Sequence, residues 1–126
     1  MEALAVFIGA GIGGLLRYGV GLVVPAVGGG KFPLATLLIN VVGSAILAGL
    51  SAWFMSKDEN TRWLVLLLTT GFTGGFTTFS TFSVETLRLL HEGNWRVASL
   101  YVVLSLVLSL AAAAGTWATV TRLSAA

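Results

Sequence analysis

The chain has 126 residues, of which 56% are hydrophobic and 10% are charged, and its formal net charge is +2. A soluble domain carries about 25% charged residues, because a small fold exposes much of its surface to water. We therefore expect an integral membrane protein. Cysteine is absent and His91 is the one histidine, which excludes disulfide scaffolds, thiolate metal sites and histidine-rich metal sites. The few basic residues are scattered between apolar segments and form no nucleic-acid-binding patch.

Uncharged segments long enough to cross a bilayer recur along the chain. Residues 32–56, 63–84 and 97–121 contain no formal charge, and a membrane-spanning helix needs about 20 predominantly apolar residues. The N-terminal segment is interrupted only by Arg17, and it is too long for a signal-peptide core and lacks a basic start. We predict a single all-α domain over 1–126, with spans at about 3–24, 33–56, 62–91 and 95–121.

Apart from Arg17, the basic residues divide evenly between the two sides of the membrane. Lys57, Arg62 and Arg122 fall on one side, and Lys31, Arg88 and Arg96 fall on the other. The positive-inside rule orients a protein through an excess of Lys and Arg on one side, and here neither side has one. We expect dual topology, with copies inserted in both directions. The alternative is a single orientation set by another feature, such as the charged amino terminus.

Small residues spaced four apart occur in three of the expected spans. Such faces let helix backbones approach closely in lipid, where no hydrophobic force drives helices together. A subunit of four helices is thin for enclosing a hydrated path, so we also expect oligomerisation through these faces. The pairs are Gly9 and Gly13, Ala10 and Gly14, Ala45 and Gly49, and Ala111 and Gly115.

The third span is unusually rich in hydroxyl side chains. Eight of the fifteen residues 69–83 are Ser or Thr, and Gly74-Gly75 lies among them. Adjacent glycines at membrane depth predict a broken helix, which survives in a bilayer only when buried in protein or lining a watery cavity. The carbonyls at the end of the first half-helix would suit a bound cation. The alternative is a continuous helix whose hydroxyls bond to carbonyls one turn back.

The remaining polar residues of the spans suggest no active site. Arg17, Asn40 and Glu85 supply no arrangement of nucleophile, base and orienting group, so we expect no enzyme activity. Asn40 either bridges two helices or lines a path, and Arg17 can snorkel toward the nearer interface. Hydroxyls, an amide donor and the electropositive edges of phenyl rings would together suit a small anion.

Three motifs carry a family resemblance. Residues 71–82 read GFTGGFTTFSTF, residues 40–44 read NVVGS, and Gly13 precedes Arg17-Tyr18 in the first span. In these motifs, its four spans and its length, the chain resembles the Fluc/CrcB fluoride channels. It departs from the family at Ala45, where we expect a larger aromatic residue, and this difference concerns packing rather than permeation.

The resemblance implies an antiparallel, dual-topology homodimer in the inner (plasma) membrane that exports fluoride passively through two pores. Asn40 would donate its amide to fluoride, and the ring edges of Phe79 and Phe82 from both subunits would line each pore. The backbone carbonyls of Gly74 and Thr77 would hold a structural Na⁺ on the dimer axis, four oxygens in all, which suits a small hard cation. No organic cofactor is implied. Further candidates for the polar lining of the route are Arg17, Thr78, Ser80, Glu85, Tyr101, Ser105 and Ser109.

Two other functions are compatible with four spans. A small proton-coupled drug exporter shares this size and dual topology, but it should carry an acidic residue deep in the first span, where this chain has none. A purely structural subunit would conduct no ion. Fluoride and chloride efflux from liposomes would test the channel, and efflux of a toxic cation driven by a proton gradient would identify the exporter.

Overall fold

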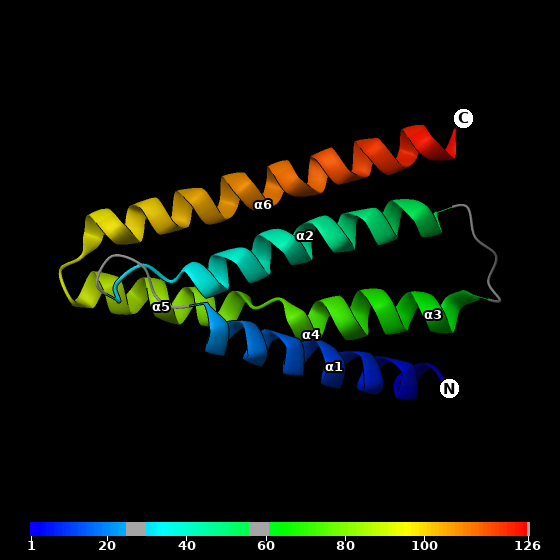
Figure 1. Ribbon diagram of the computed structural model, residues 1–126, viewed down its shortest axis with the longest axis horizontal. Helices are drawn as coiled ribbons and strands as arrows, with labels where there is room; N and C mark the ends of the chain where they lie inside the picture. Colours follow the sequence, from blue (N-terminus) through cyan, green and yellow to red (C-terminus); the bar gives the residue numbers. More distant parts are fainter. Residues whose placement is uncertain (25–29, 56–60, 126) are drawn as a thin grey trace.

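The computed structural model describes residues 1–24, 30–55 and 61–125, and these form a helical bundle (Figure 1). Its long helices are α1 (Glu2–Val23), α2 (Leu34–Phe54) and α6 (Trp95–Ser124), and a third span runs in pieces over Arg62–His91. All four are long and apolar enough to cross a membrane. The predicted all-helical membrane architecture is therefore confirmed, and α6 continues three residues past the expected end at 121.

The third span changes helix type along its length. It begins with α3 (Arg62–Leu66), widens into the π-helix η2 (Leu67–Thr73), returns to α4 (Gly74–Phe76) and continues as α5 (Phe79–His91). Between α4 and α5 the backbone is extended, with φ −79° and ψ 160° at Thr77 and φ −154° and ψ 111° at Thr78. A break was expected near Gly74-Gly75; both glycines are helical, and the extended residues Thr77 and Thr78 follow them.

The glycines of the third span serve close packing against α1. A Cβ at Gly75 would lie 2.5 Å from the carbonyl oxygen of Ala10, and one at Gly13 would lie 2.7 Å from the backbone nitrogen of Phe76. Gly9 likewise faces backbone atoms of η2, so only residues without a side chain fit on this face. The small-residue face at Gly9 and Gly13 thus packs α1 onto the first half of the third span within one subunit.

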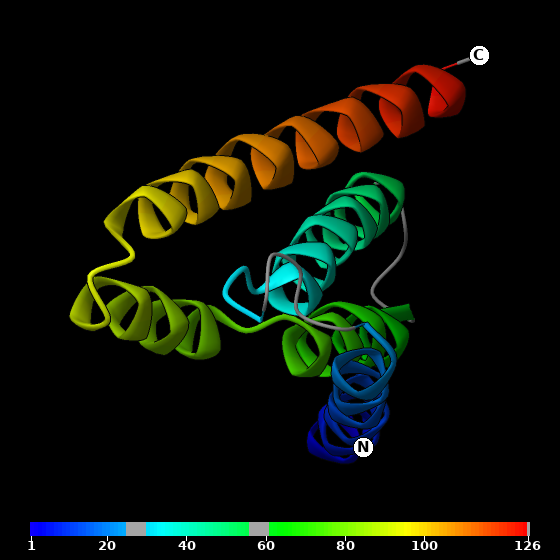
Figure 2. The same cartoon turned by 60° about the vertical axis from the view of Figure 1, so that its left-hand side comes forward.

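The other half of the bundle is built around α6. This helix packs against α2 along its length and against α5 near its start, and it lies inclined to the other helices in Figure 2. The buried cluster between them contains Leu37, Leu89, Ala98 and Tyr101. In this bundle α1 packs mainly on the first half of the third span, α6 packs mainly on α2, and α2 also contacts η2 and α1.

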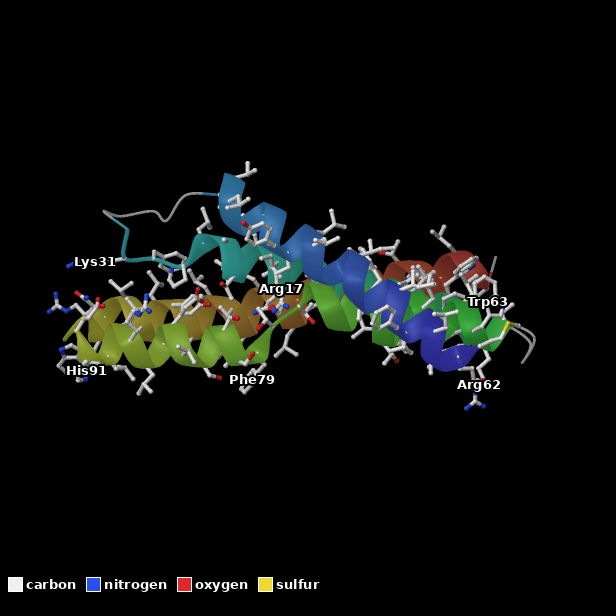
Figure 3. All side chains as sticks on the ribbon, turned by 90° about the horizontal axis from the view of Figure 1, so that it is seen from below. Arg17, Lys31, Arg62, Trp63, Phe79 and His91 are labelled. Atoms are coloured by element: carbon white, nitrogen blue, oxygen red, sulfur yellow. The ribbon has the colours of Figure 1, made fainter. Side chains whose placement is uncertain are left out.

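Charged and indole side chains lie toward the two ends of the bundle. Lys31 and His91 lie at one end and Arg62 and Trp63 at the other (Figure 3). Arg62 forms an exposed ion pair with Glu2, at 3.1 Å, which joins the beginning of the third span to the beginning of α1. Lys57, one of the six basic residues counted above, lies outside the described residues, as does Pro25.

Candidate functional site

An open groove of about 300 Å³ runs between α2, α5 and α6. Its walls combine hydroxyls, one amide and two phenyl rings, with apolar side chains between them. Six residues predicted from the sequence to contact a permeating anion meet in this groove: Asn40, Thr78, Phe79, Phe82, Ser105 and Ser109. The seventh, Ser80, lines a neighbouring cavity instead.

The two phenyl rings of the groove differ in how much of each is covered. Phe79 and Phe82 contact each other, with ring centroids 5.7 Å apart and planes inclined by 39°. Phe82 also packs on Tyr101, at 5.2 Å, and is partly buried in the core between α2, α5 and α6. Phe79 remains 79% exposed and points away from the bundle (Figure 3). The chain by itself therefore covers one ring and leaves the other exposed.

The serines of α6 give the groove its polar wall. Ser105 is 6% exposed, and its hydroxyl has no hydrogen-bond partner among the residues that the structure describes. Ser109 follows one turn later on the same face, since residues four apart lie one above the other on a helix. A buried hydroxyl without a partner is unfavourable, so Ser105 has hydrogen-bonding capacity to offer within this groove.

Glu85 is held between α2 and α6 by two hydroxyls. Thr36 donates to its Oε1 at 3.0 Å, and Tyr101 donates to its Oε2 at 2.8 Å. Glu85 also lines three separate cavities. Thr36 was not among the residues predicted from the sequence, although its position four residues before Asn40 on the same helix face could have indicated it.

The amide of Asn40 is bonded to the interruption of the third span. Its Nδ2 donates to the carbonyl oxygen of Thr78 at 3.1 Å, and its Oδ1 accepts from the backbone N–H of Thr78 at 2.9 Å. Both bonds use backbone groups of the extended residues, so α2 is tied to the point where α4 ends.

Hydroxyl side chains cap the N-terminus of α5. The Thr78 Oγ1 accepts from the backbone N–H of Thr81 at 3.1 Å, which caps the helix N-terminus. The same hydroxyl donates to the Thr81 Oγ1 at 2.9 Å and lies 3.3 Å from the Ser80 Oγ. The predicted polar residues Thr78 and Ser80 therefore also have a structural role.

Several backbone carbonyls, among them those of Gly74 and Thr77, lose their regular helical partners at the interruption. In a continuing α-helix, the N–H of Thr78 would donate to Gly74 and that of Thr81 would donate to Thr77. Both N–H groups donate to side chains instead, the first to Asn40 and the second to Thr78. The oxygens freed in this way belong to Gly74 and Thr77, the two residues that the family resemblance associates with Na⁺. Within the described ranges no group of three His, Cys, Asp or Glu side chains is placed to bind a metal.

Arg17 lines a separate cavity of about 520 Å³. It lies near mid-length of the bundle (Figure 3) and shares this cavity with Thr36, Thr78 and Glu85. Among the described residues, the guanidinium group has no ion pair or hydrogen bond. A permanent positive charge thus faces a cavity that shares Thr78 with the groove.

Comparison with known proteins assigns the chain to a family. The model of the CrcB-like, camphor-resistance (CrcB) family matches residues 4–117. The chain is 46% identical to the fluoride-specific ion channel FluC of Methylobacterium sp. (strain 4-46), over 94% of each chain. It is 47% identical to FluC 2 of Geobacillus kaustophilus, over 84% of this chain and 82% of that one. It is 40% identical to FluC of Coxiella burnetii (strain CbuK_Q154), over 90% and 92%. These relatives are named as ion channels and not as enzymes, and the chain belongs to the CrcB-like family.

Proposed function

We propose that the protein is a fluoride-selective channel that lets fluoride leave the cell by passive diffusion. The observation that carries this proposal is the meeting of an amide, two phenyl rings and two α6 serines in one groove, in a chain whose relatives are named fluoride-specific channels. We place it in the inner (plasma) membrane, where a channel would release fluoride that enters as neutral HF and ionises inside.

The chemistry of the groove suits a small anion that has lost part of its water. Asn40 has a second amide hydrogen besides the one that it donates to Thr78. The Ser105 hydroxyl forms no hydrogen bond with any described residue. Phenyl edges add weaker electrostatic attraction without a charge that would trap the ion. Thr78, Ser80, Tyr101, Arg17 and Glu85 would continue the polar route on either side.

A second copy of the chain would complete the pore. Phe79 is 79% exposed although it stands at the groove, and an antiparallel partner would cover it and add its own ring. The even division of basic residues supports copies inserted both ways, since neither end of the bundle has the excess that fixes orientation. Two-fold symmetry would then generate two pores per homodimer.

A structural Na⁺ at the centre of this dimer fits the donors present. The carbonyl oxygens of Gly74 and Thr77 are hard, neutral ligands without their regular helical donors. Gly74 is exposed in the isolated chain. A Cβ there would have only the carbonyl oxygen of Thr69 within 4 Å, at 3.9 Å. The carbonyls of Gly74 and Thr77 would hold the Na⁺, which would supply positive charge between the subunits.

Ion efflux from liposomes tests the function directly. Purified protein should release fluoride and retain chloride, with both ions followed by electrodes. Fluoride efflux with retained chloride supports a fluoride channel. Absence of efflux would identify a structural subunit, and efflux of a toxic cation driven by a proton gradient would identify an exporter.

Replacing each ring tests the aromatic part of the pore. Phe79→Ile and Phe82→Ile keep apolar bulk and remove the electropositive edge, so fluoride efflux should fall by at least about tenfold while the dimer persists. Phe7→Ile is a matched control, because Phe7 is 77% exposed on α1, away from the groove. Dimeric Phe79→Ile and Phe82→Ile proteins with unchanged efflux would exclude the rings from the mechanism.

The sodium site has its own test. Gly74→Val should weaken both dimerisation and efflux, because the added side chain has room within one subunit but enters the space of the proposed ion and partner. Replacing Na⁺ by a large organic cation during purification should have the same effect. Unchanged dimerisation under both conditions would contradict the site.

A further inference from the structure

The interruption of the third span is set by contacts with α2, and we propose that Asn40 is a positioning residue that fixes it. The two Asn40 bonds, 3.1 Å and 2.9 Å long, engage both backbone groups of Thr78. A side-chain amide carries the same donor and acceptor as a peptide unit. Asn40 therefore pairs with Thr78 as a neighbouring backbone would, and we call this pair of bonds the Asn40 latch.

The latch supplies partners that an interrupted helix lacks. Unpaired backbone groups are strongly unfavourable at membrane depth, so extended backbone there depends on protein partners. Thr78 is 6% exposed, which leaves its N–H and C=O little access to water. Without Asn40, pairing of the Thr78 N–H with Gly74 through regular helix becomes the competing arrangement. The latch thus favours the extended conformation over the continuous helix.

Gly43 provides the second contact, one turn after Asn40 on α2. A Cβ at Gly43 would collide with the Cγ2 methyl of Thr77, so the missing side chain makes room for that methyl. The Thr77 hydroxyl meanwhile donates to the carbonyl of Thr73 at 3.0 Å, which fixes the side-chain rotamer. Asn40 and Gly43 together form a receptor on α2 for the extended pair Thr77-Thr78.

The position of the interruption determines where α5 begins, and therefore which way the rings of Phe79 and Phe82 face. Thr78 is the N-cap of α5, Phe79 is the first residue of that helix, and Phe82 follows one turn later. A shift of the interruption by one residue would rotate α5 by about 100° and carry both rings away from the groove. The Asn40 latch consequently aligns the rings, and the remaining Nδ2 hydrogen stays available to the groove.

Hydrogen exchange tests the latch without reference to any ion. Asn40→Leu keeps the side-chain volume and removes both bonds, so the Thr78 amide in the full-length protein should exchange at least about tenfold faster. Ser44→Ala is the control, because Ser44 lies on the same helix and in the same groove without a hydrogen bond to Thr78. Amides of α6 serve as an internal reference. Unchanged exchange at Thr78 in Asn40→Leu would overturn the proposal, and Asn40 would then act only on the ion.

A pair of substitutions tests the Gly43 contact if Asn40→Leu fails to fold. Gly43→Ala should lower fluoride efflux by about tenfold, and adding Thr77→Ser, which removes the colliding methyl and keeps the hydroxyl, should recover most of the loss. Gly11→Ala is the control, since nothing lies within 4 Å of an added Cβ there. Efflux that is no higher in the double variant than in Gly43→Ala would refute the receptor. This arm rests on the proposed fluoride function, whereas the exchange arm does not, so their failures are distinguishable.

Discussion

The carboxylate of Glu85 is fixed by two buried hydroxyls, and removing one of them should measurably destabilise the protein. A hydrogen bond to a charged group contributes about 1.5–3 kcal/mol. Tyr101 is 0% exposed and its hydroxyl lies 2.8 Å from Glu85 Oε2, so Tyr101→Phe should lower the free energy of unfolding by about 2 kcal/mol. Thr36→Val removes a longer hydrogen bond, 3.0 Å, and should lower the free energy of unfolding by about 1.5 kcal/mol.

The measurement is chemical unfolding in mixed micelles, followed by the fluorescence of the four tryptophans at one fixed protein concentration. The control is the same Tyr101→Phe change in a Glu85→Leu background. There the hydroxyl has lost its acceptor, so its removal should be neutral or stabilising. An equal loss in both backgrounds would refute the reasoning, because the hydroxyl would then act through packing and not through the carboxylate.

Three further substitutions test other parts of the structure. Ser105→Ala removes a buried hydroxyl that has no hydrogen-bond partner in the described part of the chain. It should raise the free energy of unfolding by about 1 kcal/mol while fluoride efflux falls, and destabilisation would mean that the hydroxyl is paired. Gly13→Ala places a Cβ against the backbone of η2 and α4 and should destabilise by about 2 kcal/mol in the same unfolding assay, whereas Gly11→Ala should change little. Equal effects would contradict close packing of α1. A single cysteine introduced beside Lys57 should react with an impermeant thiol reagent from both sides of the cell membrane, and labelling from one side would exclude dual topology.

The spans were predictable because a bilayer imposes one simple requirement. Charge-free stretches of sufficient length identify membrane helices whatever their neighbours, so the ranges around α2 and α6 follow from the sequence alone. The family motif also led to the residues that meet in the groove, such as Asn40 and Phe82. What these residues have in common is a polar or aromatic group in an otherwise aliphatic span.

The position of the interruption was not predictable from local sequence. Gly74 and Gly75 suggested a break because glycine is conformationally permissive. Permissive residues stay helical when packing favours helix, and Gly75 does so against the backbone of Ala10. The extended conformation occurs at Thr77 and Thr78 because α2 supplies partners there. Contacts between residues so distant in the chain leave no mark on a local pattern.

Because of the length of α6, the tilt of this helix should depend on the thickness of the bilayer. Trp95 and Trp117 on this helix are 22 residues apart, about 33 Å at 1.5 Å per residue, close to the roughly 30 Å of a typical hydrocarbon core. Lipids with shorter acyl chains would accommodate this indole spacing by a larger tilt of α6. The helix contacts both α2 and α5, and it carries Ser105 and Ser109 into the groove between them. Acyl-chain length should therefore alter the width of the groove, and transport rates compared between membranes are meaningful only when the lipids match.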